Sequence, residues 1–188
     1  YFRLVLAVFL FLGGWQIVSA ETNELMVRCV AFYNLENVFD TIHDEGKNDY
    51  EYLPDGGMKW TSLKYTNKIQ NMAYAIAQLG TDEDPRGAAI VGVSEVENIG
   101  CLHDLCKELK EKHNRNYVPI LLEGPDRRGI DVGLLYNPDM FKPVGQPKGY
   151  ELKAHYADGG VVRSRLQLWV SGYMLDDSRK IVMDKIHI

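Results

Sequence analysis

Hydrophobic residues follow two different spacings along the chain, and these separate helices from strands. Apolar residues at three- and four-residue steps predict one amphipathic helix from Thr61 or Ser62 to about Leu79, ended by Gly80, and another over 99–112. Runs rich in β-branched and aromatic residues predict strands at 25–34, 88–96, 117–122, 130–136, 161–171 and 179–188. Helices come early and strands dominate later, which predicts an α/β chain without internal repeats.

The first two predicted strands both end in amide and carboxylate side chains. One ends as FYNLEN (32–37) and the other as VGVSEVEN (91–98). Side chains two apart in a strand lie on the same face, so Asn34 and Glu36 are expected to share a face, as are Glu95 and Glu97. If these strands are neighbours in one sheet, their tips converge on a single site.

Carboxylates and an amide at such a site suit a hard divalent cation. Mg²⁺ takes one or two carboxylates, waters and phosphate oxygens, and it polarises a bound phosphoryl group. Asn34 would orient an acid or a phosphate without adding charge. However, many strands end in carboxylates that bind nothing, and Glu97 also fits an exposed residue or an acid at the start of the next helix. Spacing alone leaves a metal site and ordinary strand ends open.

Arginines recur at two further points. The stretch GPDRRGIDVGLLYNP (124–138) places Arg127 and Arg128 on a turn before a strand that carries Asp131. Guanidinium groups there could hold a phosphate by paired hydrogen bonds, whereas a solvated loop with surface arginines is the simpler interpretation. Asp131 is expected at a sheet edge or paired with one of these arginines. Arg163 and Arg165, which enter the strand RSRLQLWVSG, raise the same choice.

Other segments carry no catalytic or metal-binding motif. Residues 43–57 form an acidic loop whose spacing does not match an EF-hand, so a solvated loop is expected. The five histidines are scattered, and no glycine-rich phosphate loop, nucleophilic serine elbow or zinc motif occurs. Cys29, Cys101 and Cys106 are too few for a disulfide framework, so buried free thiols are expected.

Composition is that of an ordinary globular protein and limits how the chain could bind phosphate. Of its 188 residues 46% are hydrophobic and 25% are charged. The net charge of -5 argues against holding polyanions by broad charge neutralisation. A phosphate-bearing ligand would have to be held locally, by a few arginines or a bound cation.

The first twenty residues are typical of a secretory signal peptide. Arg3 supplies a positive flank, residues 4–12 are apolar, and small residues precede a cleavage site after Ala20. The apolar run is too short to span a bilayer. We therefore expect a mature domain over 21–188 that is secreted or periplasmic and has no stable membrane association. The chain starts with Tyr and stops within the alternating run KIVMDKIHI, which predicts a piece of a longer protein.

The order FYNLEN, helix, IVGVSEVEN and DRRGIDVGLLYNP resembles the amino-terminal half of the endonuclease/exonuclease/phosphatase superfamily, and its secreted bacterial members above all. The resemblance covers roughly residues 27–188. It implies the deoxyribonuclease-I-like fold, a four-layer α/β/β/α sandwich with mostly antiparallel sheets, incomplete in this chain. It also implies Mg²⁺- or Mn²⁺-dependent cleavage of phosphoester bonds, in nucleic acids, inositol phosphates, sphingomyelin or related substrates.

The resemblance carries roles over to individual positions. Glu95 corresponds to the principal metal-binding glutamate of the family, and Asn34 to the first-strand asparagine that orients the site. Glu36 stands where some members have a second metal-supporting acid. Arg165 matches a phosphate-facing arginine. Glu97 receives no role.

The catalytic motifs that follow in the family do not occur in this sequence. They are a histidine and asparagine block, a D-x-N motif and a terminal Asp-His pair. His187 lies just before the place where the first of these motifs is expected and does not fill it. The resemblance therefore implies a phosphoesterase whose present chain lacks the usual general acid or base and is inactive or nearly so. The alternative is a non-catalytic secreted binding or surface protein that retains the fold. Substrate identity and oligomeric state stay open.

Overall fold

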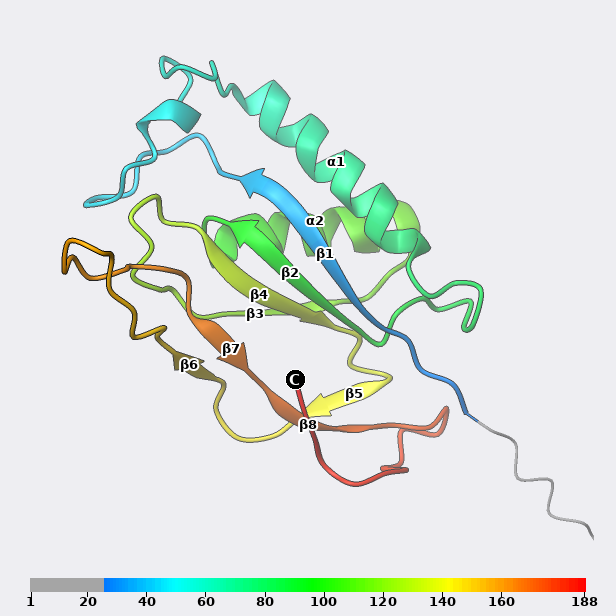
Figure 1. Cartoon of the computed structure of the whole chain (residues 1–188). Coiled ribbons are helices and arrows are strands. Elements are labelled where there is room, and N and C mark those ends of the chain that lie inside the picture. The colour runs from blue at the N-terminus through cyan, green and yellow to red at the C-terminus, as the bar shows by residue number, and fades with distance from the viewer. Residues whose placement is uncertain (1–25) are drawn as a thin grey trace, which may run out of the picture.

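A computed structural model describes residues 26–188, and a mixed central sheet lies at its centre (Figure 1). The predicted signal peptide lies outside the described residues. The sheet has the strand order β1-β2-β4-β3. Its strands are β1 (Val30–Val38), β2 (Ile90–Val96), β3 (Val118–Leu121) and β4 (Asp131–Tyr136). β1 and β2 pair in parallel, and the other pairs are antiparallel. The two strands with polar tips are therefore neighbours.

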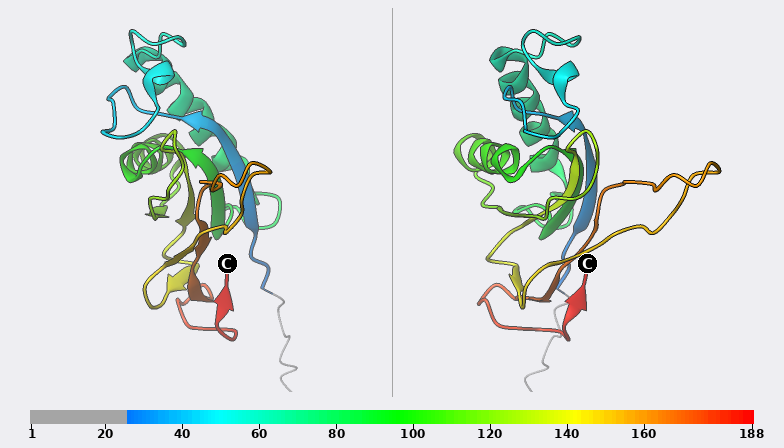
Figure 2. Two further views of the ribbon diagram at one scale, coloured as in Figure 1. Left: turned by 60° about the vertical axis from the view of Figure 1, so that its left-hand side comes forward. Right: turned by 90° about the vertical axis from the view of Figure 1, so that its left-hand side faces the viewer.

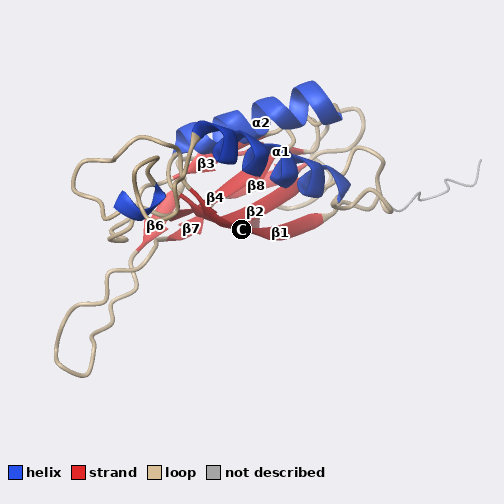
Figure 3. Cartoon of the chain, turned by 90° about the horizontal axis from the view of Figure 1, so that it is seen from above, coloured by secondary structure: helices blue, strands red, loops and turns tan. Residues whose placement is uncertain are grey.

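Two helices cover one face of this sheet (Figure 3). They are α1 (Ser62–Gln78) and α2 (Ile99–His113), close to the predicted boundaries. The side chain of Thr61 caps α1 by accepting a hydrogen bond from Lys64 N, and Asn98 caps α2 by accepting one from Cys101 N. Each cap satisfies a backbone N–H in the first turn of its helix.

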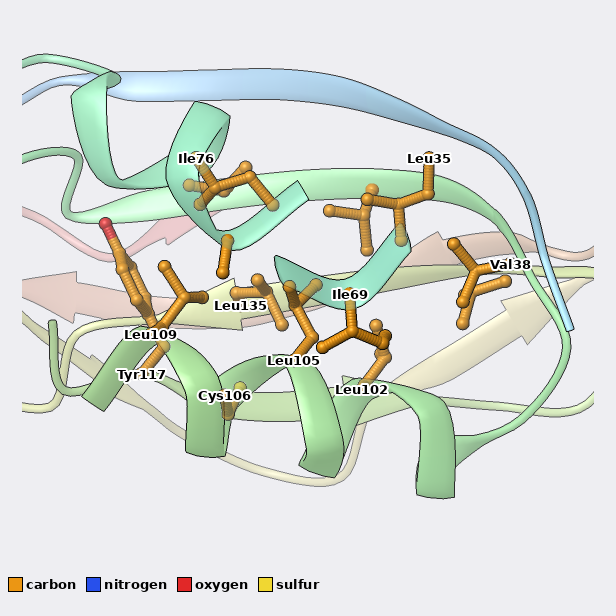
Figure 4. Packing of buried hydrophobic residues seen from close by; sticks show 14 of the residues in the cluster. Leu35, Val38, Ile69, Ile76, Leu102, Leu105, Cys106, Leu109, Tyr117 and Leu135 are labelled. Carbon is orange, nitrogen blue, oxygen red and sulfur yellow. The ribbon is translucent and has the colours of Figure 1, made fainter. Parts of the chain in front are cut away.

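The main hydrophobic core fills the space between the helices and the sheet (Figure 4). Leu35 of β1, Ile76 of α1, Leu105 of α2 and Leu135 of β4 are all fully buried in it. Each such side chain contributes about 1.5–3 kcal/mol by leaving water. This core fixes which face of each strand turns toward the helices.

A second, smaller layer packs on the other face of the sheet. It contains β5 (Phe141–Pro143), β8 (Ser171–Met174) and β9 (Ile186–His187) in the order β5-β8-β9, and the pair β6 (Lys148–Tyr150) and β7 (Gln167–Trp169). Phe141, Val170 and Met174 meet Ile90 and Leu134 of the central sheet in a second buried cluster. The described residues thus form an α/β/β arrangement of the deoxyribonuclease-I-like type.

The later predicted strands are shorter than expected. The stretch 151–166 is an arm that projects from the body (right view of Figure 2), so the predicted strand over 161–171 begins only at Gln167. A bridge between His155 and Val161 closes this arm on itself, so it gains no partner strand. Within 179–188 the only strand is β9. β5 and β6 were missed, because three residues are too few to show a strand periodicity.

The acidic loop is more ordered than predicted. It contains a 3₁₀ turn over Tyr50–Tyr52, and Asp49 is buried rather than solvated. Asp49 accepts hydrogen bonds from the ring of His43 and from Asp44 N, which close the loop on itself. The expectation of a solvated loop is wrong for this part of the segment.

The three cysteines form no disulfide within the described residues. All three are free thiols, and Cys101 and Cys106 are buried, as predicted, whereas Cys29 is only partly buried. Between residues 26 and 188 no helix is long and apolar enough to cross a membrane.

Candidate functional site

A bulge at the tip of β2 determines where its glutamates lie. Ser94 pairs with Val132 and Val96 with Asp131, so Glu95 is an extra residue with no partner on β4, and its φ is +63°. Val96, not Glu95, follows Val93 into the core under the helices. Glu95 is thereby kept out of that core, with 22% of its side chain exposed. The expected shared face of Glu95 and Glu97 is wrong for this reason.

The tip of β1 is bent in a similar way. Asn34 pairs with Ser94, which places it one residue from Glu95 across the strand pair. Its Oδ1 accepts hydrogen bonds from Glu36 N (3.0 Å) and from the Ser94 hydroxyl (3.3 Å). Glu36 and Asn37 both have positive φ, so the strand alternation stops at Leu35. Asn34 therefore stabilises the bend that joins the two tips.

Glu36 does not lie beside Asn34 at the site, as its position two residues along the strand had suggested. Its side chain is 76% exposed, and its Oε2 lies 4.0 Å from Lys68 Nζ on α1. Lys68 Nζ also donates to the backbone oxygen of Glu36. The structure brings Asn34 and Glu95 together, whereas Glu36 lies at the rim beside α1.

Arg165 reaches the same site from the base of the projecting arm. Its Nη2 lies 3.6 Å from Glu95 Oε1, and its Nε is buried without a hydrogen-bond partner among the described residues. Gly124 makes this approach possible, because a Cβ there would lie 2.8 Å from Asp131 Oδ1 and 3.1 Å from Leu166 N. A buried donor without a partner next to a carboxylate indicates a site for another acceptor group.

Tyr52, which the sequence patterns did not single out, and Arg128 complete the surroundings of Glu95. Burial raises the pKa of the Tyr52 hydroxyl, with Glu51 and Glu95 adding to the rise and Arg128 opposing it. Tyr52 stacks on Phe39 with ring centroids 4.1 Å apart. Arg128 Nη1 also donates to Asn37 Oδ1 at 3.4 Å. A tyrosine in a polar loop has no distinguishing pattern, so a role for Tyr52 could not be predicted from sequence.

Glu97 belongs to a separate buried cluster with Asp40 and Cys101. It is only 3% exposed, and its Oε2 accepts a hydrogen bond from Asp40 N at 2.7 Å. Burial raises the pKa of Glu97 to about 8, with nearby Asp40 adding to the rise. Burial also raises the pKa of the Cys101 thiol to about 12. Asp40 N donates to Glu97 and the Asn98 amide donates to Asp40, so this cluster joins the start of α2 to the end of β1. A donor set that includes a thiol also suits a hard cation poorly.

The surroundings of Glu95 fit a hard divalent cation better. Its carboxylate is partly exposed at a strand tip, and its charged neighbour Arg165 stays beyond hydrogen-bonding distance. One carboxylate with room for water and substrate oxygens is a donor set that Mg²⁺ accepts. Glu95 is the residue that would hold such an ion, with Asn34 beside it.

Asp131 lies next to the site in a role that the sequence did not indicate. It is 1% exposed, and its Oδ1 accepts a hydrogen bond from Gly124 N at 2.9 Å. It therefore lies neither at an exposed edge nor in a pair with arginine, as had been expected. Burial raises its pKa to about 6, although the Gly124 bond and the charge of Lys47 oppose the rise.

Replacing Asp131 by Asn should stabilise the protein at neutral pH. Because the folded-state pKa is above the unfolded value, the acid stabilises the fold below about pH 4, and this contribution is lost as the pH rises through about 6. Asp131→Asn keeps the acceptor for Gly124 N and never ionises. We expect its free energy of unfolding in urea to exceed that of the wild type by about 2 kcal/mol at pH 8 and to match it near pH 4.

The exposed Asp82 provides the control for this measurement, because Asp82→Asn should change the stability at neither pH. A constant difference between Asp131→Asn and the wild type at both pH values would contradict the assigned ionisation.

A family model decides the classification. The model of the Endonuclease/Exonuclease/phosphatase family matches residues 29–186, which is almost the whole described chain. The chain belongs to this family. Members of the endonuclease/exonuclease/phosphatase family are usually hydrolases of the phosphoesterase type and generally depend on a divalent metal. No curated protein matches the chain.

Two solved structures are similar to the chain at low identity. An endonuclease/exonuclease/phosphatase from Bacteroides vulgatus is 17% identical, with a TM-score of 0.42, and the match covers 80% of this chain and 48% of that one. An endonuclease/exonuclease/phosphatase family protein from Bacteroides thetaiotaomicron is 18% identical, with a TM-score of 0.42, and the match covers 80% and 44%. The chain spans about half the length of these family members.

Proposed function

We propose that this chain supplies the amino-terminal half of a secreted, Mg²⁺- or Mn²⁺-dependent phosphoesterase that hydrolyses phosphodiester or phosphomonoester bonds. The observation that carries the proposal is the placement of Glu95. A left-handed bulge holds its carboxylate out of the core, beside Asn34 and 3.6 Å from Arg165. Family membership supports the reaction type. Residues 1–20 support export.

The residues around Glu95 have distinct roles in this proposal. Arg165 and Arg128 bind phosphate oxygens, since guanidinium groups match their geometry and stay charged. The phenol of Tyr52, whose pKa burial raises further above its ordinary value, is a hydrogen-bond donor. Asn34 keeps the two strand tips in register through its bonds to Ser94 and Glu36 N. When bound at Glu95, the cation supplies polarisation of the phosphoryl group. Glu36 is the secondary, supporting acid.

We further propose that the 188 residues alone turn over little substrate. The chain has no histidine at the tips of β1 and β2, and the family's histidine, D-x-N and Asp-His motifs are absent from its sequence. A general acid or base of the usual kind then has to come from additional polypeptide.

The test compares this chain with the protein translated from the complete reading frame. Both are assayed with bis(4-nitrophenyl) phosphate, 4-nitrophenyl phosphate, DNA and RNA, in Mg²⁺, in Mn²⁺ and in EDTA. We expect the complete protein to hydrolyse at least one substrate in Mg²⁺ or Mn²⁺, to lose this activity in EDTA and to regain it when metal is restored. The 188-residue chain should stay near the blank.

Activity of the complete protein that persists in EDTA would contradict metal dependence. If the complete protein hydrolyses none of these substrates under any condition, the non-catalytic binding protein is the better description.

A further inference from the structure

A second group of cationic side chains lies beside the proposed active site. A pocket of about 570 Å³ is lined by the loop over 46–48, by residues 125–127 and by Arg163. Its charged residues are Lys47, Arg127 and Arg163 against the single acid Asp126. The pocket is thus locally positive in a chain whose net charge is -5.

In each of the two arginine pairs of the sequence, one arginine lies at the proposed active site and the other lines the neighbouring pocket. Arg128 and Arg165 lie at the proposed active site, through Asn37 and Glu95 respectively. Arg127 and Arg163, one and two residues before them, line the neighbouring pocket instead. The same two chain segments therefore supply one arginine to the proposed active site and another to the pocket.

Hydrogen bonds hold the loops of this pocket in place. Asn48 N donates to Arg127 O at 2.7 Å, which joins the loop after β1 to the loop before β4. Lys47 Nζ donates to Gly124 O at 3.2 Å. Gly129, with φ +82°, leaves space for the stem of Lys47, since a Cβ there would lie 3.1 Å from Lys47 Cγ. These contacts hold the backbone that presents Lys47 and Arg127.

The arginines of the pocket keep their charges available. The only acid in the pocket, Asp126, accepts a hydrogen bond from Arg128 N, and its Oδ1 lies 3.9 Å from Arg128 Nε. Within residues 26–188 the side chains of Arg127 and Arg163 make no hydrogen bond or ion pair, and both are exposed. Free guanidinium groups that converge on a pocket suit a phosphate group, which they bind through paired donors.

We propose that Lys47, Arg127 and Arg163 bind a second phosphate group of the substrate while the reacting phosphoester lies at Glu95. This inference rests on the proposed function and narrows its substrate class. The substrate carries at least two phosphates, either as successive links of a nucleic acid strand or as several groups on one small molecule. A single isolated phosphoester leaves the pocket without a ligand.

The test measures binding to the complete protein in EDTA, so that neither metal nor turnover contributes. The probes are a fluorescein-labelled single-stranded DNA 12-mer and inositol hexakisphosphate. For Arg127→Ala/Arg163→Ala we expect about tenfold weaker binding of one or both probes. Arg127→Lys/Arg163→Lys, which keeps the charge and loses the paired donors, should fall between this variant and the wild type.

The matched control is Lys110→Ala/Lys112→Ala on α2, which removes the same charge from exposed positions and should bind like the wild type. Thermal unfolding of all variants verifies that they are folded. A loss confined to the DNA assigns the pocket to a nucleic acid strand, and a loss confined to inositol hexakisphosphate assigns it to a small polyphosphate.

Unchanged affinity of Arg127→Ala/Arg163→Ala for both probes overturns the inference. An equal loss in the Lys110→Ala/Lys112→Ala control does the same, because binding then follows net charge alone. Failure of the proposed function looks different: the wild-type protein would hydrolyse none of bis(4-nitrophenyl) phosphate, 4-nitrophenyl phosphate, DNA and RNA in Mg²⁺ or Mn²⁺, while the binding difference in EDTA would remain.

Discussion

Replacing Glu95 by Gln is expected to lower kcat/KM of the complete protein about 1,000-fold in Mg²⁺, the largest effect on activity that the site implies. The substitution keeps the size of the side chain and the bulged backbone, and it removes the charge that would bind the cation. Mg²⁺ affinity, measured by calorimetry without substrate, should also fall more than about tenfold. A positive φ is as acceptable for Gln as for Glu, so stability should be preserved.

The same substitution at two other glutamates serves for comparison with Glu95→Gln. Glu36→Gln should cost about tenfold or less, because this side chain is mostly exposed and lies beside Lys68. Glu111→Gln, on the exposed side of α2, should leave the rate unchanged. The assignment of the principal ligand fails if Glu95→Gln retains wild-type rates, or if Glu36→Gln loses more activity than Glu95→Gln.

Phe141→Ala is expected to be the most destabilising of the changes considered, by about 4 kcal/mol in urea-induced unfolding. Phe141 is completely buried between the central sheet and the smaller sheet. Its ring meets Tyr136 edge-on with centroids 6.0 Å apart, and it lies so close to Gly172 that a Cβ there would be 2.2 Å from Phe141 Cζ. Such a fitted ring leaves a cavity that its neighbours cannot fill.

The same substitution at Phe32 is the control. Phe32 is 66% exposed on β1, so Phe32→Ala should change the free energy of unfolding by less than about 0.5 kcal/mol. Similar losses for the two variants would show that the smaller sheet does not pack on the central sheet around Phe141.

Periodicity predicted the parts of the fold that bury long apolar stripes. Both helices were predicted, and Thr61 was one of the two caps proposed for the first, because it and the Gly80 stop frame a 17-residue stripe that packs against the sheet. The Asn98 cap of α2 was not predicted. The short strands β5 and β6 were not predictable, since their pairing depends on partners remote in sequence. The arm over 151–166 has strand-forming residues, but it lacks a neighbouring strand to pair with, so propensity alone misjudged it.

The candidate site was predictable in its members and not in its geometry. The parallel pairing of β1 and β2 brings Asn34 next to Ser94 and so close to Glu95, as the two polar tips suggested. Strict alternation, however, misplaced Glu97 and put Glu36 on the same face as Asn34. The reason is that no sequence pattern indicates a positive φ at a residue other than Gly or Asn. Asp131 was misjudged because its partner is a backbone N–H, which no side-chain pattern reveals.

The bulge at Glu95 has a consequence for transferring this chemistry to another protein. In a regular β2 the residue after Ser94 would turn toward Val93 and the core under the helices, and the exposed carboxylate would belong to a different position. A graft that copied Ser-Glu-Val-Glu onto a straight strand would therefore bury the acid meant for the ligand. A successful graft has to include the inserted residue with its φ of +63°. The identities of the surrounding residues matter less than this backbone conformation.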